Sequence, residues 1–302
     1  MYIIIVGGGE VGYELAHHLI YQGQNVVVIE NDKGRVERFK KNPALKVVEG
    51  NGAQALVLEQ AGIKKADLLV AVTDMDEVNT LACLLAKKYY VPHTVCRIRG
   101  KGFLKEDSSL ISQFGIDMVI NPEKVAALEI LRMLQFSDAG VNKSFAGDRI
   151  RHVVIFGGGA LGYQLALLLE SSRQHFVVKL IEKSMKVCKK LDLELQKTLV
   201  LNGDVTEISM LKEEELYAAD AVIAATSDDR TNIVAALLVR EFGPKKIICE
   251  VKKQQNIPVY KTLGLDSLIS PRLLVAAQIN CLTRGEELLD LFILPGEMDR
   301  SI

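Results

Sequence analysis

Long apolar runs are absent from this sequence of 302 residues, although 49% of its residues are hydrophobic. No apolar stretch approaches the ~18 residues that a membrane-spanning helix requires. The apolar run at the N-terminus ends at Gly7, which is too early for a signal peptide. A net charge of −1 provides no bulk attraction to nucleic acid or to an anionic membrane. We therefore expect a cytoplasmic protein without a nucleic-acid partner, which reaches a membrane only through another protein.

Metal and disulfide chemistry also lack their usual patterns. The sequence has five cysteines, and no two of them form a C-x-x-C pair. The five histidines are scattered, and no cysteine or carboxylate stands at metal-ligand spacing from them. We expect buried, reduced thiols and no metal site.

Three common catalytic motifs are missing as well. The sequence has no G-x-x-x-x-G-K-[ST] phosphate loop, no G-x-S-x-G nucleophile turn and no tyrosine followed four residues later by lysine. No group stands ready for hydride transfer or hydrolysis. The sequence thus favours a binding protein over an enzyme.

What the sequence does contain is a glycine-rich turn in a specific context. An apolar run to Val6 leads into Gly7-Gly8-Gly9-Glu10-Val11-Gly12, and a helical pattern, a second apolar run and Glu30 follow. This order of strand, G-x-G-x-x-G turn, helix, strand and acid is the dinucleotide-binding fingerprint. In that fingerprint Gly7 permits the tight turn, Gly9 lets a pyrophosphate approach, and Gly12 allows close packing of the helix. Glu30 would accept hydrogen bonds from ribose hydroxyls and would repel the 2′-phosphate of NADP. The alternative is a turn that serves packing alone and binds no nucleotide.

The fingerprint occurs twice, and the rest of the pattern repeats with it. Gly157-Gly158-Gly159-Ala160-Leu161-Gly162 matches the first turn, Glu182 matches Glu30, and residues 219–226 match 66–73. The region of Asn51 and Gly52 returns with Asp204, and the two copies carry Pro122 and Pro271 at corresponding places. The repeat predicts a first domain at 1–136, a linker at 137–150 and a second domain at 151–302.

Strands and helices alternate in each copy. In the first copy we expect strands near 2–6, 25–29, 46–48, 68–72, 94–98 and 117–120, and helices near 10–22, 33–41, 54–61, 77–89 and 123–135. Such alternation gives an α/β fold of two tandem, Rossmann-like, doubly wound parallel-sheet domains. The carboxyl ends of the strands would meet at one crevice, which is the usual ligand site of such sheets.

Other candidate residues follow strands that end at this crevice. Asn51, before Gly52, would either cap the next helix or reach the adenine side of a ligand. Thr73, with Asp74, would face the second ribose of a dinucleotide, or Thr73 would cap the helix that follows. Arg97 would clamp a phosphate or form a salt bridge at a sheet edge. Glu250 stands at the matching position of copy two, which makes the first crevice the better anion site.

Several of these stretches together resemble the Trk potassium-uptake regulators, members of the family of domains that regulate K⁺ conductance (RCK or KTN). The resemblance rests on residues 4–12, 47–52, 66–73, 96–99, 120–123, 154–159 and 203–204. It implies NAD(H) as the first candidate cofactor and ATP or ADP as others. It also implies a homo-oligomer at the inner face of the cell membrane, docked on a K⁺-translocating subunit of the TrkH or TrkG type. The contacts it implies are Gly7 through Val11, Glu30, Asn51, Gly52, Thr73, Asp74, Arg97, Gly157 through Leu161, Glu182 and Asp204.

One departure from the family is large. Each nucleotide domain is normally followed by a smaller regulatory subdomain, whereas only a short linker separates the two copies here and the chain stops soon after the second. Two other functions remain open at this point. One is an NAD-dependent oxidoreductase that uses Asp74 or Asp76, and the other is a structural assembly subunit with unoccupied crevices.

Overall fold

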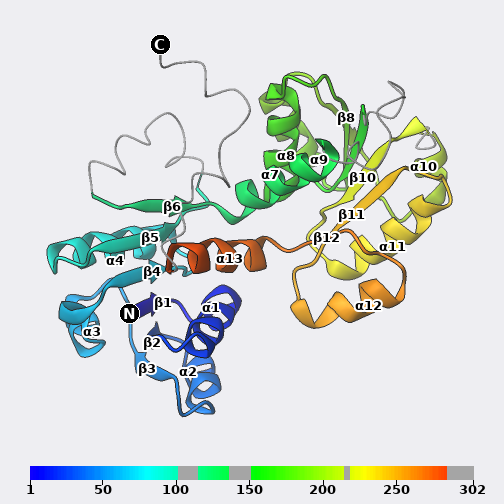
Figure 1. Ribbon diagram of the computed structural model, residues 1–302. Helices are drawn as coiled ribbons and strands as arrows, with labels where there is room; N and C mark the ends of the chain where they lie inside the picture. Colours follow the sequence, from blue (N-terminus) through cyan, green and yellow to red (C-terminus); the bar gives the residue numbers. More distant parts are fainter. Residues whose placement is uncertain (101–114, 136–150, 214–217, 284–302) are drawn as a thin grey trace, which may run out of the picture. The chain divides into compact units, whose positions relative to one another are not determined.

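The computed structural model describes residues 1–100, 115–135, 151–213 and 218–283 (Figure 1). It contains two six-stranded sheets, with the strand orders β3-β2-β1-β4-β5-β6 and β12-β11-β10-β7-β8-β9. All the pairings within them are parallel. The expected tandem of Rossmann-like, doubly wound α/β domains is confirmed.

The strands and α-helices of the first copy begin and end within two residues of the expected positions. The elements are β1 (Tyr2–Val6), α1 (Glu10–Tyr21), β2 (Asn25–Glu30), α2 (Lys33–Lys40), β3 (Lys46–Glu49), α3 (Ala55–Gln60), η1 (Ile63–Lys65), β4 (Leu68–Ala71), α4 (Asp76–Lys88), β5 (His93–Arg97), β6 (Met118–Ile120) and α7 (Pro122–Gln135). The short helix η1 was not expected.

The second copy repeats the order of the strands. Its elements are β7 (His152–Phe156), α8 (Ala160–Ser171), β8 (Val177–Glu182), α9 (Met185–Glu194), β9 (Leu199–Asn202), α10 (Ile208–Glu213), β10 (Ala221–Ala224), α11 (Asp229–Arg240), β11 (Lys246–Glu250), η4 (Gln254–Asn256), α12 (Ile257–Thr262), β12 (Leu268–Ile269) and α13 (Pro271–Thr283). Of these, η4 and α12 lie between the last two strands.

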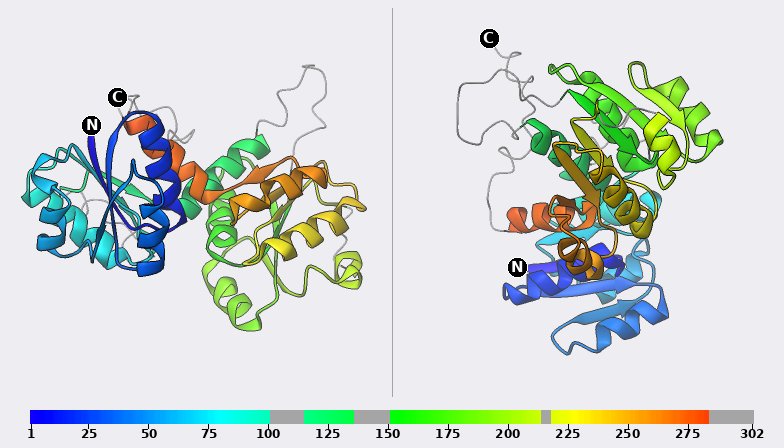
Figure 2. Two further views of the ribbon diagram at one scale, coloured as in Figure 1. Left: turned by 90° about the horizontal axis from the view of Figure 1, so that it is seen from below. Right: turned by 90° about the vertical axis from the view of Figure 1, so that its right-hand side faces the viewer.

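Helices cover both faces of the first sheet (Figures 1 and 2). Alternate strand residues point to opposite faces, so one set of apolar side chains packs under α3 and α4. This core is built around Ile4, Val6, Ile29, Leu58 and Cys83, each at least 90% buried. The strands read as continuous apolar runs because both faces are covered.

The compact units of the structure differ from the expected domain boundaries at the terminal helices. The first unit comprises Met1–Pro122 and Arg272–Ile302, and the second comprises Glu123–Pro271. Helix α7 thus belongs to the second unit, although it follows β6 of the first, and α13 belongs to the first unit, although it follows β12 of the second. The expected linker at 137–150 lies outside the described residues.

The side chains of Cys83, Cys96, Cys188 and Cys249 are buried and free, as expected. Among the helices described here, none is both long enough and apolar enough to traverse a bilayer.

Candidate functional site

The first crevice begins at the turn between β1 and α1. Gly7 has φ +105°, and a Cβ on it would lie 2.8 Å from the Thr73 nitrogen. A Cβ on Gly12 would overlap the carbonyl oxygen of Gly7, so only glycine lets α1 sit this close to the turn. Gly9 is the N-cap residue of α1 and makes no side-chain cap bond, and the space where its Cβ would lie meets only Arg35, at 3.7 Å. The helix therefore presents unpaired N–H groups to an open space.

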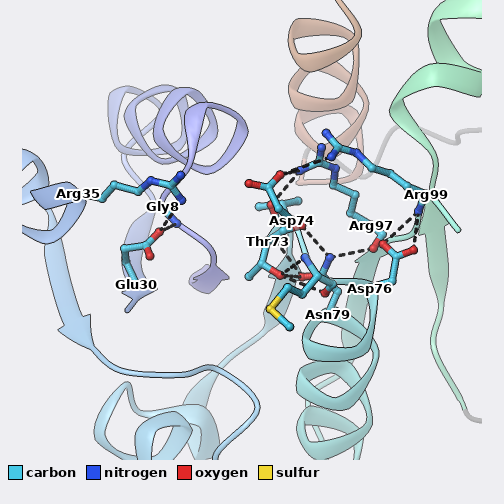
Figure 3. Close-up of polar contacts among 11 residues, drawn as sticks. Gly8, Glu30, Arg35, Thr73, Asp74, Asp76, Asn79, Arg97 and Arg99 are labelled. Atoms are coloured by element: carbon cyan, nitrogen blue, oxygen red, sulfur yellow. Dashed lines mark hydrogen bonds and ion pairs between the residues drawn. The ribbon is translucent and has the colours of Figure 1, made fainter. Parts of the chain in front are cut away.

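Glu30 is held against this turn from the end of β2 (Figure 3). Its Oε2 accepts a hydrogen bond from the Gly8 nitrogen at 2.6 Å. Its Oε1 accepts from the nitrogens of Asn31 and Asp32 at 2.8 and 2.9 Å. An ion pair with Arg35, at 3.6 Å, adds a cation beside the carboxylate. Backbone N–H groups thus fix the carboxylate of Glu30 beside the glycine-rich turn, and the Gly8 N–H is already occupied.

Thr73 and Asn79 fasten the end of β4 to the end of β5. Asn79 is fully buried, and its Oδ1 accepts from the nitrogen and hydroxyl of Thr73 at 2.8 and 2.7 Å. Its Nδ2 donates to the carbonyl oxygens of Thr73 and Arg97 at 3.0 and 2.9 Å. Thr73 is not the N-cap of α4, since that residue is Met75.

Asn51 forms a turn after β3 and is not the N-cap of α3. Its Oδ1 accepts a hydrogen bond from the Ala53 nitrogen at 2.9 Å, and the N-cap residue of α3 is Gln54.

Arg97 supplies a buried positive charge at the same edge of the sheet. It is 3% exposed, its Nη1 donates to the Val72 carbonyl oxygen at 3.2 Å, and it lies 3.5 Å from Asp74 Oδ1. Asp74 also pairs with Arg99 at 3.5 Å (Figure 3). The Nε of Arg97 is buried and has no hydrogen-bond partner among the described residues. A buried donor without a partner costs about 1–3 kcal/mol, which a bound acceptor would recover.

One cavity of about 340 Å³ joins these groups in the first unit. Most of the candidate residues of this copy line it, whereas Gly8 and Gly12 do not. The candidates in the lining are Gly7, Gly9, Glu10, Val11, Glu30, Asn51, Gly52, Thr73, Asp74 and Arg97.

The sequence pattern missed three cations of this cavity. Arg35, Arg99 and Arg272 all line it. Arg35 comes from α2, where a single arginine in a polar stretch gives no signal, and Arg99 follows β5, two residues after Arg97. Arg272 comes from α13, at the far end of the sequence. The cavity therefore presents four arginines around a glycine-rich turn, a combination that suits an extended anion such as the phosphate chain of a nucleotide.

The second crevice repeats the turn and the acid. Glu182 Oε2 accepts from the Gly158 nitrogen at 2.8 Å, and its Oε1 accepts from the Ser184 nitrogen at 2.7 Å. Asp204 binds Lys183 at 2.6 Å, and this hydrogen bond lowers the pKa of Asp204 to about 2. A cavity of about 340 Å³ is lined by five of the candidates, namely Gly157, Gly158, Gly159, Glu182 and Asp204. It is not lined by Ala160, Leu161 or Gly162.

Glu250 occupies the place of Arg97 at the end of β11. It is 5% exposed and pairs with Lys252 through Oε1 at 3.3 Å, whereas its Oε2 has no hydrogen-bond partner among the described residues. Burial raises the pKa of the Glu250 carboxyl, and the carboxylates of Glu123 and Asp229 raise it further, against the effect of Lys252. The end of β11 thus carries a buried carboxylate where the end of β5 carries a guanidinium, although Glu250 does not line the second cavity as Arg97 lines the first.

A metal ion is usually bound by several His, Cys, Asp or Glu side chains together. Within the residues that the structure describes, no three His, Cys, Asp or Glu side chains gather as a metal site would require. The groups that fit a ligand are the open N-terminus of α1, the carboxylate of Glu30 and the unpartnered Nε of Arg97.

Comparison with known proteins identifies both halves of the chain. The model of the TrkA-N domain family matches residues 3–122 and, a second time, residues 153–271. Only residues 123–152 lie between the two matches.

Curated relatives match across nearly the whole chain. One is "Trk system potassium uptake protein trkA homolog 1" of Methanosarcina mazei, 27% identical over 98% of this chain and 93% of that protein. Another is "Trk system potassium uptake protein TrkA" of Vibrio alginolyticus, 28% identical over 90% of this chain and 77% of the relative. The first alignment extends over 380 positions, so that relative carries residues with no counterpart here.

Solved structures share the fold. The GsuK structure bound to ADP superposes with a TM-score of 0.73 at 20% identity, over 95% of this chain and 70% of that one. The GsuK channel bound to NAD gives 0.72 at 16% identity, over 94% of this chain and 64% of that one.

Proposed function

The chain belongs to the TrkA-N domain family, and on this basis we propose that it is a nucleotide-binding regulatory subunit of a K⁺ uptake system. The relatives named as Trk potassium uptake proteins support this role. Its partner would be a K⁺-translocating membrane subunit of the TrkH or TrkG type, on whose cytoplasmic side a homo-oligomer of this chain would dock.

The lining of the first crevice is the main support for this proposal. The glycine-rich turn, a carboxylate at the ribose position and the buried, unpartnered Nε of Arg97 line a single cavity. An adenine nucleotide offers partners for all three, because its phosphates accept hydrogen bonds and its ribose donates them. NAD(H) is the first candidate, and ATP and ADP are the others. The ADP and NAD bound in the two GsuK structures support this choice.

Regulation would follow from linkage between the ligand and the conformation of the protein. A nucleotide shifts a gate only to the extent that it binds one conformation better than the other. A coupling of about 1–3 kcal/mol corresponds to a change in affinity of roughly 5- to 150-fold. In this protein the groups that would sense the ligand are the N-terminus of α1 and the arginines of the cavity.

The two acids that an oxidoreductase could use are engaged elsewhere. Asp74 pairs with Arg97 and Arg99, at 3.5 Å each. Asp76 accepts hydrogen bonds from the backbone nitrogens of Arg99 and Gly100, the shortest at 2.6 Å. Both carboxylates are thus already engaged by neighbouring groups of the protein, which favours the regulatory role over catalysis.

Calorimetric titration of the full chain with NADH, NAD⁺, ATP and ADP tests the proposal. We expect saturable binding and no consumption of NADH when carbonyl compounds are added. Matched variants assign the sites: Gly9→Asp and Gly159→Asp each place a carboxylate at the approach of the phosphates, in a space that the protein leaves open. Aspartate is also a good N-cap, so neither variant should lower stability. Failure of all four nucleotides to bind would leave only the structural alternative.

A further inference from the structure

The two crevices differ most at the end of the fifth strand of each sheet. Arg97 ends β5 and Glu250 ends β11, and the two are 3% and 5% exposed. Each has one buried polar atom without a hydrogen-bond partner among the described residues, the Nε donor of Arg97 and the Oε2 acceptor of Glu250. The Nε of Arg97 can donate a hydrogen bond to a ligand that accepts one. The carboxylate of Glu250 would repel a ligand that carries negative charge.

A second charge reversal occurs where the terminal helices begin. Glu123 is the second residue of α7, and Arg272 is the second residue of α13. In sequence, Glu123 follows the copy that contains Arg97, and Arg272 follows the copy that contains Glu250, so each follows the copy with the opposite charge.

The helices belong instead to the other unit, so the charges reinforce each other. Arg272 lines the same cavity as Arg97 and Arg99. Glu123 lies near enough to Glu250 to raise the pKa of that carboxyl. The first unit thereby gathers cations at its strand edge, and the second gathers carboxylates.

We propose that this arrangement sorts nucleotides by the length of their phosphate chain. The first crevice takes nucleotides with two or more phosphates, including dinucleotides, and Arg272 selects them together with Arg97. The second crevice takes a nucleoside monophosphate of the AMP class, from which Glu250 and Glu123 exclude longer chains. This inference rests on the proposed function, since it requires that both crevices bind nucleotides.

The physical reason lies in the path of the phosphates. In both crevices the first phosphate would sit at the glycine-rich turn, on the N-terminus of a helix of 12 residues. In the first unit a single cavity extends from that turn to Arg97, Arg99 and Arg272. In the second unit a longer chain would run past the cavity lining toward the end of β11, where Glu250 would repel it.

The lysines of the second unit do not cancel this repulsion. Lys183 lies at the opposite side of the crevice, where its ion pair with Asp204 at 2.6 Å occupies it. Lys252 already pairs with Glu250 at 3.3 Å.

The experiment uses the full chain with one crevice blocked at a time. A chain with Gly159→Asp reports on the first crevice, and a chain with Gly9→Asp reports on the second. Each is titrated with AMP, ADP, ATP and NAD⁺ by calorimetry. We expect the second crevice to bind AMP at least tenfold more tightly than ATP or NAD⁺, and the first crevice to show the reverse order.

Charge variants then identify the residues responsible. With the second crevice blocked, Arg272→Glu should weaken ATP binding at least tenfold and leave AMP binding unchanged. With the first crevice blocked, Glu250→Gln combined with Glu123→Gln should strengthen ATP binding at least tenfold, again without affecting AMP. Because AMP is the internal control, a variant that merely disturbs the fold would change both ligands.

The outcomes separate this inference from the proposed function. Equal preferences in the two crevices, or charge variants that alter AMP and ATP alike, would overturn the sorting and leave nucleotide regulation standing. Absence of binding by any nucleotide in either crevice would overturn both.

Discussion

At the scale of single residues, Glu30 has two tasks. Its carboxylate accepts three backbone N–H groups, which shape the turn, and it lines the cavity where a ribose would lie. We predict that Glu30→Ala weakens nucleotide binding in the first crevice by about 10- to 150-fold, the equivalent of about 1.5–3 kcal/mol for a hydrogen bond to a charged group. The thermal midpoint should also fall, because three backbone donors, including the buried N–H of Gly8, lose their acceptor. Calorimetry and thermal unfolding measure the two effects.

The matched control for Glu30 is Glu182→Ala, which should alter the second crevice alone. Unchanged affinity in Glu30→Ala would show that the ribose does not lie beside this carboxylate.

Glu250 provides a test of electrostatics that needs no ligand. Its pKa is raised, mainly by burial, so the folded state binds the proton more tightly than the unfolded state does. The destabilisation is therefore absent below the unfolded pKa of about 4.3 and develops as the pH rises toward the folded value. We predict that Glu250→Gln raises stability at pH 7.5 by about 1 kcal/mol, or about 2–4 °C in thermal midpoint. The gain should vanish near pH 4, and a gain independent of pH would contradict this origin.

The candidate site could be predicted from the sequence only where residues belong to a motif. The glycine-rich turn, Glu30 and Arg97 follow strands at fixed positions, and the structure brings them to one cavity. Arg35 and Arg272 could not be found, because their place in the cavity depends on the direction of α2 and on the path of α13. The site residues of the second copy were harder to predict. The spacing of Ala160 and Leu161 matches the motif, but neither residue lines the cavity.

At the scale of helices and strands, most of the fold was predictable. A parallel sheet covered on both faces requires continuous apolar strands, and these alternate in the sequence with amphipathic helices. The packing partner of α7 and α13 could not be predicted, because an apolar helix face shows that a helix is buried but not against which sheet.

The side chain of Asn79 connects α4, β4 and β5, and its removal should destabilise all three. The amide connects α4 to the ends of β4 and β5 through four hydrogen bonds and is fully buried. We predict that Asn79→Ala destabilises the first unit by about 2–4 kcal/mol, since buried donors and acceptors are left unpaired. Hydrogen exchange should show the loss of protection in β4 and β5.

Asn232→Ala is the matched variant in the second unit, where Asn232 bonds Thr226 and the Glu250 carbonyl oxygen in the same way. Each variant should affect its own unit first. Stability within about 0.5 kcal/mol of the wild type in Asn79→Ala would mean that these hydrogen bonds are replaced by water.

At the scale of the whole molecule, the exchange of terminal helices links the folding of the two copies. Each unit is completed by a helix whose neighbours in sequence belong to the other unit. The apolar face that α7 contributes to the second unit is substantial and includes Val125, Ala126, Ala127, Ile130, Leu131 and Leu134, all buried. Fully burying one large aliphatic side chain contributes about 1.5–3 kcal/mol, so neither unit should retain its stability without the exchanged helix.

The two copies should not be stable as separate monomeric fragments. Fragment 1–149 keeps α7 but lacks α13, and fragment 150–302 keeps α13 but lacks α7. Each fragment then exposes an apolar helix together with an uncovered sheet surface, and both should self-associate or unfold at lower temperature than the intact chain. Mixed in equal amounts, they should form a one-to-one complex in which each supplies the helix that the other lacks. Light scattering coupled to size-exclusion chromatography measures these masses. A monomeric fragment 1–149 with the thermal midpoint of the intact chain would show that α7 contributes nothing to the second unit. The proximity of the two carboxylates of Glu123 and Glu250 would then lose its structural basis.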